Sequence, residues 1–419
     1  MPKTAATRRR ADASDSAPGA LWSRNFLLFF TARAVAKLGD MMLPVALAAG
    51  LVAHGYGASA VGGALAAFTA CFAGFVIFGG VIADRFNPQR LMIGADVVRI
   101  GTQSLMAVMF FTGRVALWEV CAIGAVNGIA AAVFQPGVAT TIPRIAADVQ
   151  GANGSIRVAE ATMTLAGPVL AGMLVGFASV GTVFVAHAGT YLASAVCLLL
   201  LRLGPMLREQ PAQPSTFRAD LVEGWREFRS RTWMWGVIVI WCSHMLLAWG
   251  PTIPLVATDV VQEHGAGAYG LINSALGAGM IVGGLLGMRL RPRHPLRAGG
   301  FAIAGMALQA LAVGLGMPVP WIAAAMVVTG AGNAFWGVMW TTSVLTQVPA
   351  PVLSRIHAYE VAGSVAMLPV GQALAGPAAG LFGVREVLLA NAVMAVVTSV
   401  ALVSVRAIRN LERVPQSAG

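Results

Sequence analysis

The stretch that decides the fold is Gly80-Val-Ile-Ala-Asp84-Arg85-Phe-Asn87-Pro-Gln-Arg90, a short charged segment between two long apolar runs. Each run, 58–83 and 91–112, is long enough to cross a bilayer as a helix, which needs about 20 apolar residues. A charged side chain is costly inside the hydrocarbon core. A tight Asp-Arg…Arg turn between two such runs therefore predicts a loop at a membrane surface.

The composition of the 419-residue chain supports a membrane protein over its whole length. Hydrophobic residues make up 57% of the chain and charged residues only 11%, whereas a globular domain carries roughly a quarter charged residues. Twelve apolar runs are long enough to span a bilayer. Each should be helical, because the bilayer core contains no water to hydrogen-bond with backbone N–H and C=O groups. They cover residues 26–53, 58–83, 91–112, 116–142, 159–179, 182–201, 234–258, 267–288, 299–317, 321–345, 358–381 and 386–405.

The net charge of +11 is distributed as in a membrane protein rather than as in a nucleic-acid-binding protein. If the first helix starts in the cytoplasm, 23 of the 28 Lys and Arg residues fall on the cytoplasmic side. Only Arg114 and Arg385 fall on the opposite side. This asymmetry follows the positive-inside rule and predicts that both termini are cytoplasmic. We therefore expect a lipid bilayer, and no nucleic acid, as the partner of the basic charge.

A polar stretch near the midpoint divides the chain into two halves. We expect a disordered cytoplasmic tail (1–20), a first six-helix bundle (21–201), a cytoplasmic linker (202–232), a second six-helix bundle (233–405) and a second cytoplasmic tail (406–419). Within the linker, Leu221, Trp225 and Phe228 lie at i, i+4 and i+7. This spacing predicts an amphipathic helix on the inner membrane surface, with a plain linker as the alternative.

The two halves show internal similarity. The spacing from Asn127 to Pro143 is 16 residues, and the spacing from Asn333 to Pro349 is the same. Ala-Gly-Pro also occurs at 166–168 and again at 375–377. Related halves predict a transporter architecture in which the substrate cavity lies between them near the bilayer midplane.

These features together resemble the major facilitator superfamily, whose signature loop between helices 2 and 3 is G-x-L-x-D-R-x-G-R-(R/K). Three stretches are similar to its macrolide-efflux and enterobactin-exporter-like branch: Gly80–Arg99, Ala32–Asp40 and Gln135–Gly172. The resemblance implies an all-α membrane protein of twelve transmembrane helices in two pseudo-symmetric six-helix bundles. It also implies a cytoplasmic gate formed by Gly80, Asp84, Arg85, Arg90 and Asp96, in which the arginines pair with Asp96 or with lipid phosphate.

The signature loop departs from the family pattern, because Asn87, Pro88 and Gln89 replace the usual glycine and one arginine. Asn tolerates the left-handed backbone that glycine would supply, so we expect the turn to be kept.

A second motif, Gly167-Pro168-x-x-x-Gly172, resembles the helix-5 motif of drug–proton antiporters. Its proline permits a bend and its glycines permit close helix approach. An ordinary kinked helix is the alternative.

The main chemical candidates are Arg33, Lys37 and Asp40, which lie at i, i+4 and i+7 on one face of the first helix. Asp40 lies about halfway along that helix. A charge at the bilayer centre costs on the order of 2.5–3.5 kcal/mol on insertion scales, so these side chains must face a wet cavity or one another. We expect Asp40 to be the proton-coupled carboxylate, with Lys37 and Arg33 as basic neighbours. A structural salt bridge is the alternative.

A substrate cavity in this fold would be lined by helices 1, 4, 7 and 10. An aromatic, mostly neutral lining there suits bulky amphipathic compounds. The candidates are Gln135, Trp241, His244, Trp249, Asn333, Trp336 and Trp340. We expect His187 and His244, which are isolated within apolar runs, to be hydrogen-bonded core groups. Glu160 is expected at the membrane interface.

Other function classes lack their motifs. The chain has no G-x-x-x-x-G-K-(S/T) for an ATP-driven pump, and no H-E-x-x-H or C-x-x-C for a membrane enzyme. We therefore expect a secondary active transporter that couples efflux of hydrophobic or amphipathic small molecules to the proton gradient. It would need no cofactor and would act as a monomer in the bacterial cytoplasmic (inner) membrane. A siderophore or metabolite exporter, an importer, and a membrane receptor or scaffold are the alternatives.

Overall fold

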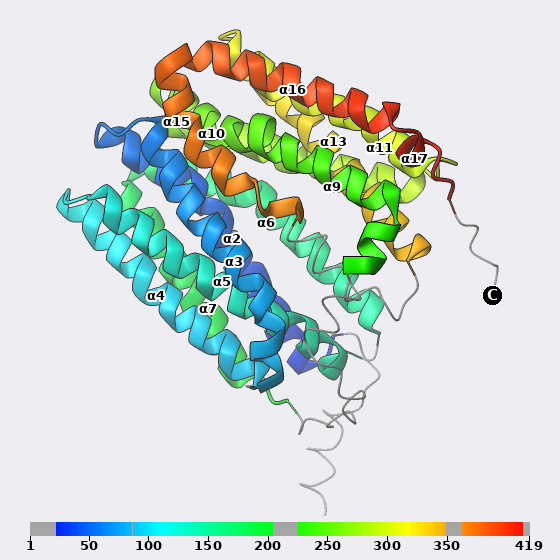
Figure 1. The fold of residues 1–419 in the computed structure, drawn as a ribbon. Coiled ribbons are helices and arrows are strands. Elements are labelled where there is room, and N and C mark those ends of the chain that lie inside the picture. The colour runs from blue at the N-terminus through cyan, green and yellow to red at the C-terminus, as the bar shows by residue number, and fades with distance from the viewer. Residues whose placement is uncertain (1–21, 86, 147, 204–224, 349–362, 414–419) are drawn as a thin grey trace, which may run out of the picture.

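The computed structural model describes residues 22–85, 87–146, 148–203, 225–348 and 363–413. In this part of the chain every regular element is a helix (Figure 1). Eleven helical segments there are long and apolar enough to cross a membrane. The predicted all-α membrane fold is confirmed.

Each spanning helix of the N-terminal half corresponds to one apolar run of the sequence. The six helices are α2 (Arg24–Ala53), α3 (Ala58–Arg85), α4 (Pro88–Thr112), α5 (Leu117–Ile145), α6 (Val149–Phe177) and α7 (Val180–Leu200). They form one bundle, in which α2 packs against α6 and α7, and α5 packs against α3 and α4 (Figure 1).

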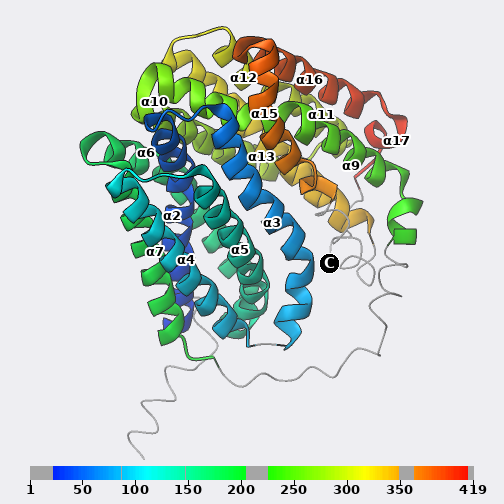
Figure 2. The ribbon, with the colours of Figure 1, turned by 60° about the vertical axis from the view of Figure 1, so that its left-hand side comes forward.

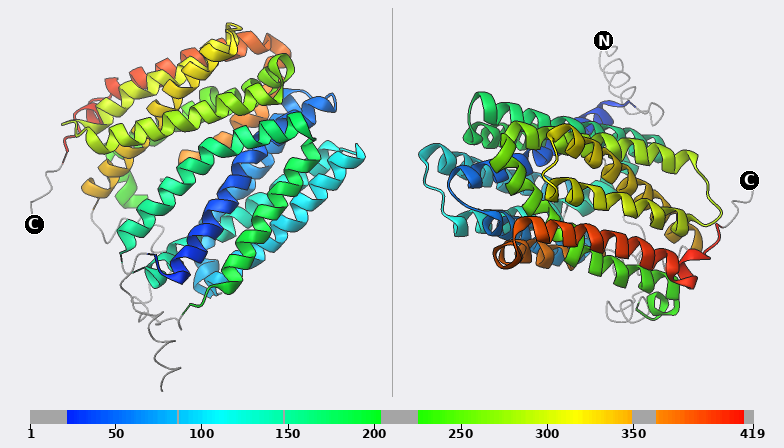
Figure 3. Two further views of the ribbon diagram at one scale, coloured as in Figure 1. Left: turned by 180° about the vertical axis from the view of Figure 1, so that it is seen from behind. Right: turned by 90° about the horizontal axis from the view of Figure 1, so that it is seen from above.

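The C-terminal half contains shorter pieces joined into spans. Its elements are α9 (Thr232–His244), the π-helix η1 (Met245–Trp249), α10 (Gly250–Arg289), α11 (Pro295–Ile303), the 3-10 helix η2 (Ala304–Met306), α12 (Ala307–Gly314), α13 (Val319–Gln347), α15 (Leu368–Phe382), α16 (Val384–Ser404) and α17 (Arg406–Arg409). Figures 2 and 3 show this bundle lying beside the first.

The longest helical segment of the second half contains two membrane crossings. Residues 232–289 form 58 continuous helical positions, which would extend about 87 Å at 1.5 Å per residue, against a hydrocarbon core of about 30 Å. Gly265 breaks the segment, with φ 80 and ψ 170, a conformation that only glycine adopts readily. With this break, the described helices account for the twelve crossings expected from the sequence.

The expected turn is kept, since α3 ends at Arg85 and α4 begins at Pro88. The left-handed backbone expected at Asn87 is wrong. Asn87 has extended backbone angles, φ −63 and ψ 119, and its side-chain oxygen accepts hydrogen bonds from the N–H groups of Gln89 and Arg90. It is therefore the N-cap of α4. Pro88 explains the backbone, because the residue before a proline is pushed into the extended region. Gln89 then ties this turn to α7 by donating to the carbonyls of Leu198 and Leu201, at 2.6 and 2.8 Å.

The two halves pack against each other most closely near the ends of the helices that lie away from the described termini. Gly376 of α15 lies against Ser59 of α3, and Gly270 of α10 lies against the carbonyl of Pro168 in α6. Toward the other end, which carries Arg24 and Arg409, the two bundles diverge (Figure 2). We call these the closed end and the basic end.

Parts of the expected linker and tails lie outside the described residues, including 1–21, 204–224 and 414–419. Within the linker, residues 225–230 are helical. Trp225 is half exposed, whereas Phe228 is buried in the core of the second half and stacks on Trp225 with ring centroids 5.8 Å apart.

Candidate functional site

The candidate site is a cavity of about 360 Å³ inside the N-terminal half. Side chains of α2, α3, α4, α5 and α7 line it, and no described residue of the second half does. Its polar and charged lining comprises Arg33, Lys37, Asp40, Arg99, Gln103, Asn127, Gln135 and Tyr191. The structure therefore brings together the three charged candidates of the first helix and Gln135.

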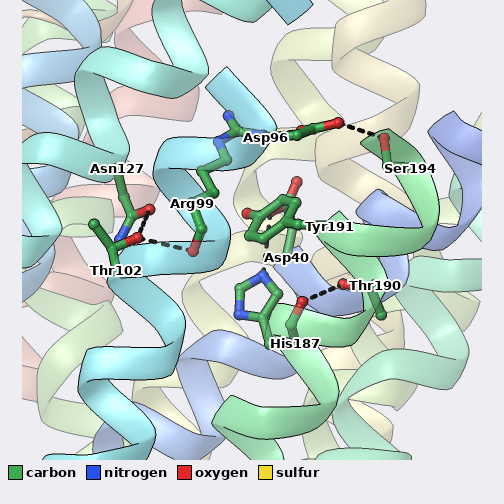
Figure 4. Close-up of polar contacts among 9 residues, drawn as sticks. All are labelled: Asp40, Asp96, Arg99, Thr102, Asn127, His187, Thr190, Tyr191 and Ser194. Carbon is green, nitrogen blue, oxygen red and sulfur yellow. Dashed lines mark hydrogen bonds and ion pairs between the residues drawn. The ribbon is translucent and has the colours of Figure 1, made fainter. Parts of the chain in front are cut away.

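Asp40 is held from across the bundle by α7. The Tyr191 hydroxyl donates a 2.5 Å hydrogen bond to Asp40 Oδ1, and His187 Nε2 lies 3.7 Å from the same oxygen (Figure 4). Gly39 makes this approach possible, because a Cβ there would clash with Thr190 and His187. The Asp40 side chain is 39% exposed and lines the cavity, so its carboxylate is accessible to water and solute.

A buried ion pair lies behind Tyr191. Arg99 Nη1 is 3.9 Å from Asp96 Oδ1, and the Ser194 hydroxyl donates to Asp96 Oδ2 at 2.7 Å (Figure 4). The Arg99 guanidinium also lies over the rings of Tyr191 and Phe134, at 5.0 and 5.4 Å from their centroids. A charged group buried inside the bundle needs such partners. We therefore assign Asp96 and Arg99 a structural role, as a buried pair that supports Tyr191 beside Asp40.

The remaining basic candidates of α2 differ in their partners. Arg33 forms an ion pair and hydrogen bond with Glu160 of α6, and its guanidinium carbon lies 5.7 Å from the centroid of the Phe134 ring. Lys37 lines the cavity one turn from Asp40 and forms no ion pair with a residue that the structure describes.

The predicted gate residues fall into two places. Gly80, Asp84 and Arg85 lie in the last turns of α3, where the side chains are outside the described residues. Arg90 is exposed in the first turn of α4. Asp96, by contrast, is completely buried and contacts Arg99 and Ser194.

The helix-5 motif lies where α6 contacts other helices. Gly167 faces Leu38 and Met41 of α2, while Gly172 faces Gly267 of α10 in the other half. Pro168 lies between them inside the helix. The motif is therefore part of the contact between the two halves.

The aromatic candidates of the second half lie apart from this cavity. Trp336 and Trp340 are buried in a cluster that Trp241 joins by stacking on Trp336, with ring centroids 5.7 Å apart. His244 is buried, with Nδ1 3.3 Å from the Thr398 hydroxyl. Asn333 and Trp249 are partly buried. Their assignment to a substrate path stays a prediction.

Sequence reasoning missed several contributors to the site, including Arg99, Gln103 and Asn127 of the lining. Tyr191 carries no charge or motif that would single it out. Glu160 was expected at the membrane interface, and His187 was expected to be a hydrogen-bonded core group. His187 is indeed buried, but neither ring nitrogen has a hydrogen-bond partner in the described structure. Its spacing of four residues from Tyr191 on α7 is the signal that could have linked the two.

Comparison with known proteins places these features in a family. The model of the Major Facilitator Superfamily matches residues 29–365. Macrolide efflux protein A of Enterococcus faecalis is 21% identical over 225 residues, which are 51% of this chain and 68% of that protein. Macrolide efflux protein A of Streptococcus pyogenes is 20% identical over 278 residues, which are 63% of this chain and 66% of that protein.

Solved transporters share the fold at low sequence identity. A POT family transporter in complex with 5-aminolevulinic acid superposes with a TM-score of 0.73 at 13% identity, covering 93% of this chain and 98% of that one. A bacterial homolog of the human lysosomal transporter Spinster, in an inward-facing and unoccupied conformation, gives 0.71 at 15% identity, covering 95% and 100%. A nucleoside transporter gives 0.72 at 13%, covering 90% and 98%.

Proposed function

This chain belongs to the Major Facilitator Superfamily and is a membrane transporter, and we propose that it exports hydrophobic or amphipathic small molecules in exchange for protons. The observation that carries the proposal is Asp40. It is a carboxylate midway along a spanning helix that lines a cavity and is held by Tyr191. Such intramembrane carboxylates mark proton and substrate pathways.

The proposed direction rests on the relatives and on the charge distribution. Both curated relatives above carry the name macrolide efflux protein. The end at which the two halves diverge is the end with both described termini and most of the basic residues. By the positive-inside rule this end faces the cytoplasm, so in this conformation the two halves open toward the side from which an exporter takes up its substrate.

The proposed exchange uses the two halves as alternating gates. Substrate enters from the cytoplasm while Asp40 is unprotonated, and the halves then rock so that the cavity opens on the other side. Substrate leaves there, and a proton binds Asp40. The protonated protein returns to the inward-open state, where Asp40 releases the proton to the cytoplasm. The close contacts of Ser59 with Gly376 and of Pro168 with Gly270 must separate in the outward-open state.

The proposal is tested in proteoliposomes with an imposed pH gradient. The substrates are a macrolide antibiotic and the neutral fluorophore phenylnaphthylamine, and empty liposomes are the control. We expect transport that stops when a protonophore collapses the gradient. If both compounds move equally fast after collapse, proton exchange is excluded.

A further inference from the structure

The cavity wall carries more basic than acidic side chains, and acids behind the wall compensate two of the bases. Arg33, Lys37 and Arg99 line the cavity with positive charge, whereas Asp40 is the one acidic residue among the lining side chains that the structure describes. Glu160 and Asp96, which neutralise two of these bases, are not part of the lining. Because these two acids compensate Arg33 and Arg99, Lys37 is the basic group of the wall that its neighbours in the described structure leave unpaired.

Among the residues that the structure describes, Lys37 is the base of this wall without an acidic partner. Arg33 is paired with Glu160, and Arg99 with Asp96. The carboxylate of Asp40 turns toward Tyr191 and His187 of α7 rather than toward the lysine. An ammonium group at membrane depth is costly without an anion or water beside it. An anion that enters the cavity could therefore pair with the Lys37 ammonium group.

A second, independent feature also lacks a partner in the cavity. Gln103 of α4 lines the same space and is only 1% exposed, yet its Oε1 accepts no hydrogen bond from the described residues. Such a buried acceptor is costly unless it is bonded. A donor group of a bound molecule, or an ordered water, would satisfy it.

The rest of the wall is apolar. Phe68 and Phe72 of α3, Met106 of α4 and Ile123 of α5 line the cavity beside these polar groups. Apolar walls with a few convergent polar groups are typical of small-molecule sites. They would hold the hydrophobic body of a ligand whose charged end lies at α2.

We propose that the cavity binds amphipathic anions. The negative group lies on the Lys37 ammonium, the apolar body lies against α3, α4 and α5, and Gln103 accepts a hydrogen bond from the ligand. This inference narrows the substrate class and rests on the proposed function in taking the cavity as the transport site.

The test uses two fluorophores that share one aromatic skeleton. Anilinonaphthalene sulfonate carries a sulfonate and phenylnaphthylamine does not. Their affinities are measured by fluorescence on purified protein in detergent, without any gradient. We expect wild-type protein to bind the sulfonate at least about tenfold more tightly than the neutral compound, as a charge-assisted contact allows.

Lys37→Gln should remove most of this preference, and Lys37→Arg should retain it because the positive charge remains. Arg157→Gln is the matched control, since it removes an exposed positive charge of α6 outside the cavity lining. We expect it to leave the preference unchanged. The wild-type comparison needs no variant, so it stands even where Lys37→Gln fails to fold.

The inference is overturned if wild-type protein binds both probes equally, or if Lys37→Gln weakens both by the same factor. The second result would mean that Lys37 supports the cavity in general. A sulfonate preference that depends on Lys37, found together with gradient-independent transport, would support this inference while excluding the proposed proton exchange. Binding and transport therefore test the two proposals separately.

Discussion

The hydroxyl of Tyr191 donates a 2.5 Å hydrogen bond to Asp40, which joins α7 to α2 across 151 positions of sequence. The same ring lies under the guanidinium of Arg99, whose carbon is 5.0 Å from the ring centroid. Tyr191 therefore connects the carboxylate in the cavity to the buried pair of Arg99 and Asp96.

Asp40→Asn should abolish gradient-driven transport and leave substrate exchange. Asparagine keeps the shape of aspartate but cannot take up and release a proton. In proteoliposomes we expect pH-driven accumulation to fall to background, while counterflow of labelled substrate continues. Glu119→Gln, which changes an acidic residue of α5 outside the cavity lining, is the control and should transport normally. Full pH-driven accumulation by Asp40→Asn would remove Asp40 from the coupling role.

Tyr191→Phe should cost more stability than Tyr56→Phe, although both remove one tyrosine hydroxyl. The Tyr191 hydroxyl donates to a carboxylate, a bond worth roughly 1.5–3 kcal/mol, whereas the Tyr56 hydroxyl donates to the neutral carbonyl of Val115, a bond worth about 0.5–1.5 kcal/mol. Thermal unfolding in detergent measures both losses. Only Tyr191→Phe should also slow pH-driven transport. Equal losses of stability would show that Asp40 is not a charged acceptor in the resting protein.

Gly376→Ala should disturb the closed end and slow transport. A Cβ on Gly376 would clash with the backbone of Ser59, and this contact joins the two halves at the closed end. The added methyl group should therefore force α15 away from α3 and destabilise the conformation in which this end is closed. Transport rates in proteoliposomes measure the effect.

The control is Gly380→Ala, because a Cβ at Gly380 would meet nothing within 4 Å. It should transport at the wild-type rate. Undiminished transport by Gly376→Ala would contradict the requirement that α15 and α3 pack closely at the closed end during the cycle.

Gly279→Val should destabilise the second half strongly, whereas Gly284→Val should be tolerated. A Cβ at Gly279 would meet the backbone carbonyl of Val327 in α13, but one at Gly284 would meet nothing within 4 Å. Overpacking against backbone costs on the order of 1–3 kcal/mol or more. Melting temperature and yield of purified protein measure the difference. Similar values for both variants would contradict the close packing of α10 on α13.

The helices could be predicted from the sequence because bilayer thickness fixes their length. The run 58–83 became α3 (Ala58–Arg85), and the break between 258 and 267 became the turn at Gly265. Neither result requires knowledge of tertiary contacts. Asn87 shows the limit of local reasoning, since the family pattern suggested a left-handed turn while the proline that follows it imposed an extended one.

Apart from Gln135 of α5, the residues of the site that could be predicted from the sequence all lie on α2. Helical spacing placed Arg33, Lys37 and Asp40 on one face, and all three line the cavity. The partners of Arg33 and Asp40 come from α6 and α7, more than 120 positions later in the sequence. No local sequence pattern predicts these contacts. Asp96 was expected in the gate with the loop arginines, and only packing shows that it is buried beside Arg99.

The six charged groups around the cavity are three bases, Arg33, Lys37 and Arg99, and three acids, Asp40, Asp96 and Glu160. With His187 neutral their charges cancel, so this cluster experiences no net force from the membrane voltage. A proton on Asp40 adds one uncompensated charge, on which 100 mV acts with about 2.3 kcal/mol if it crosses the whole field. In the proposed cycle with a neutral substrate, voltage therefore drives only the return of the proton-loaded protein, and transport is electrogenic.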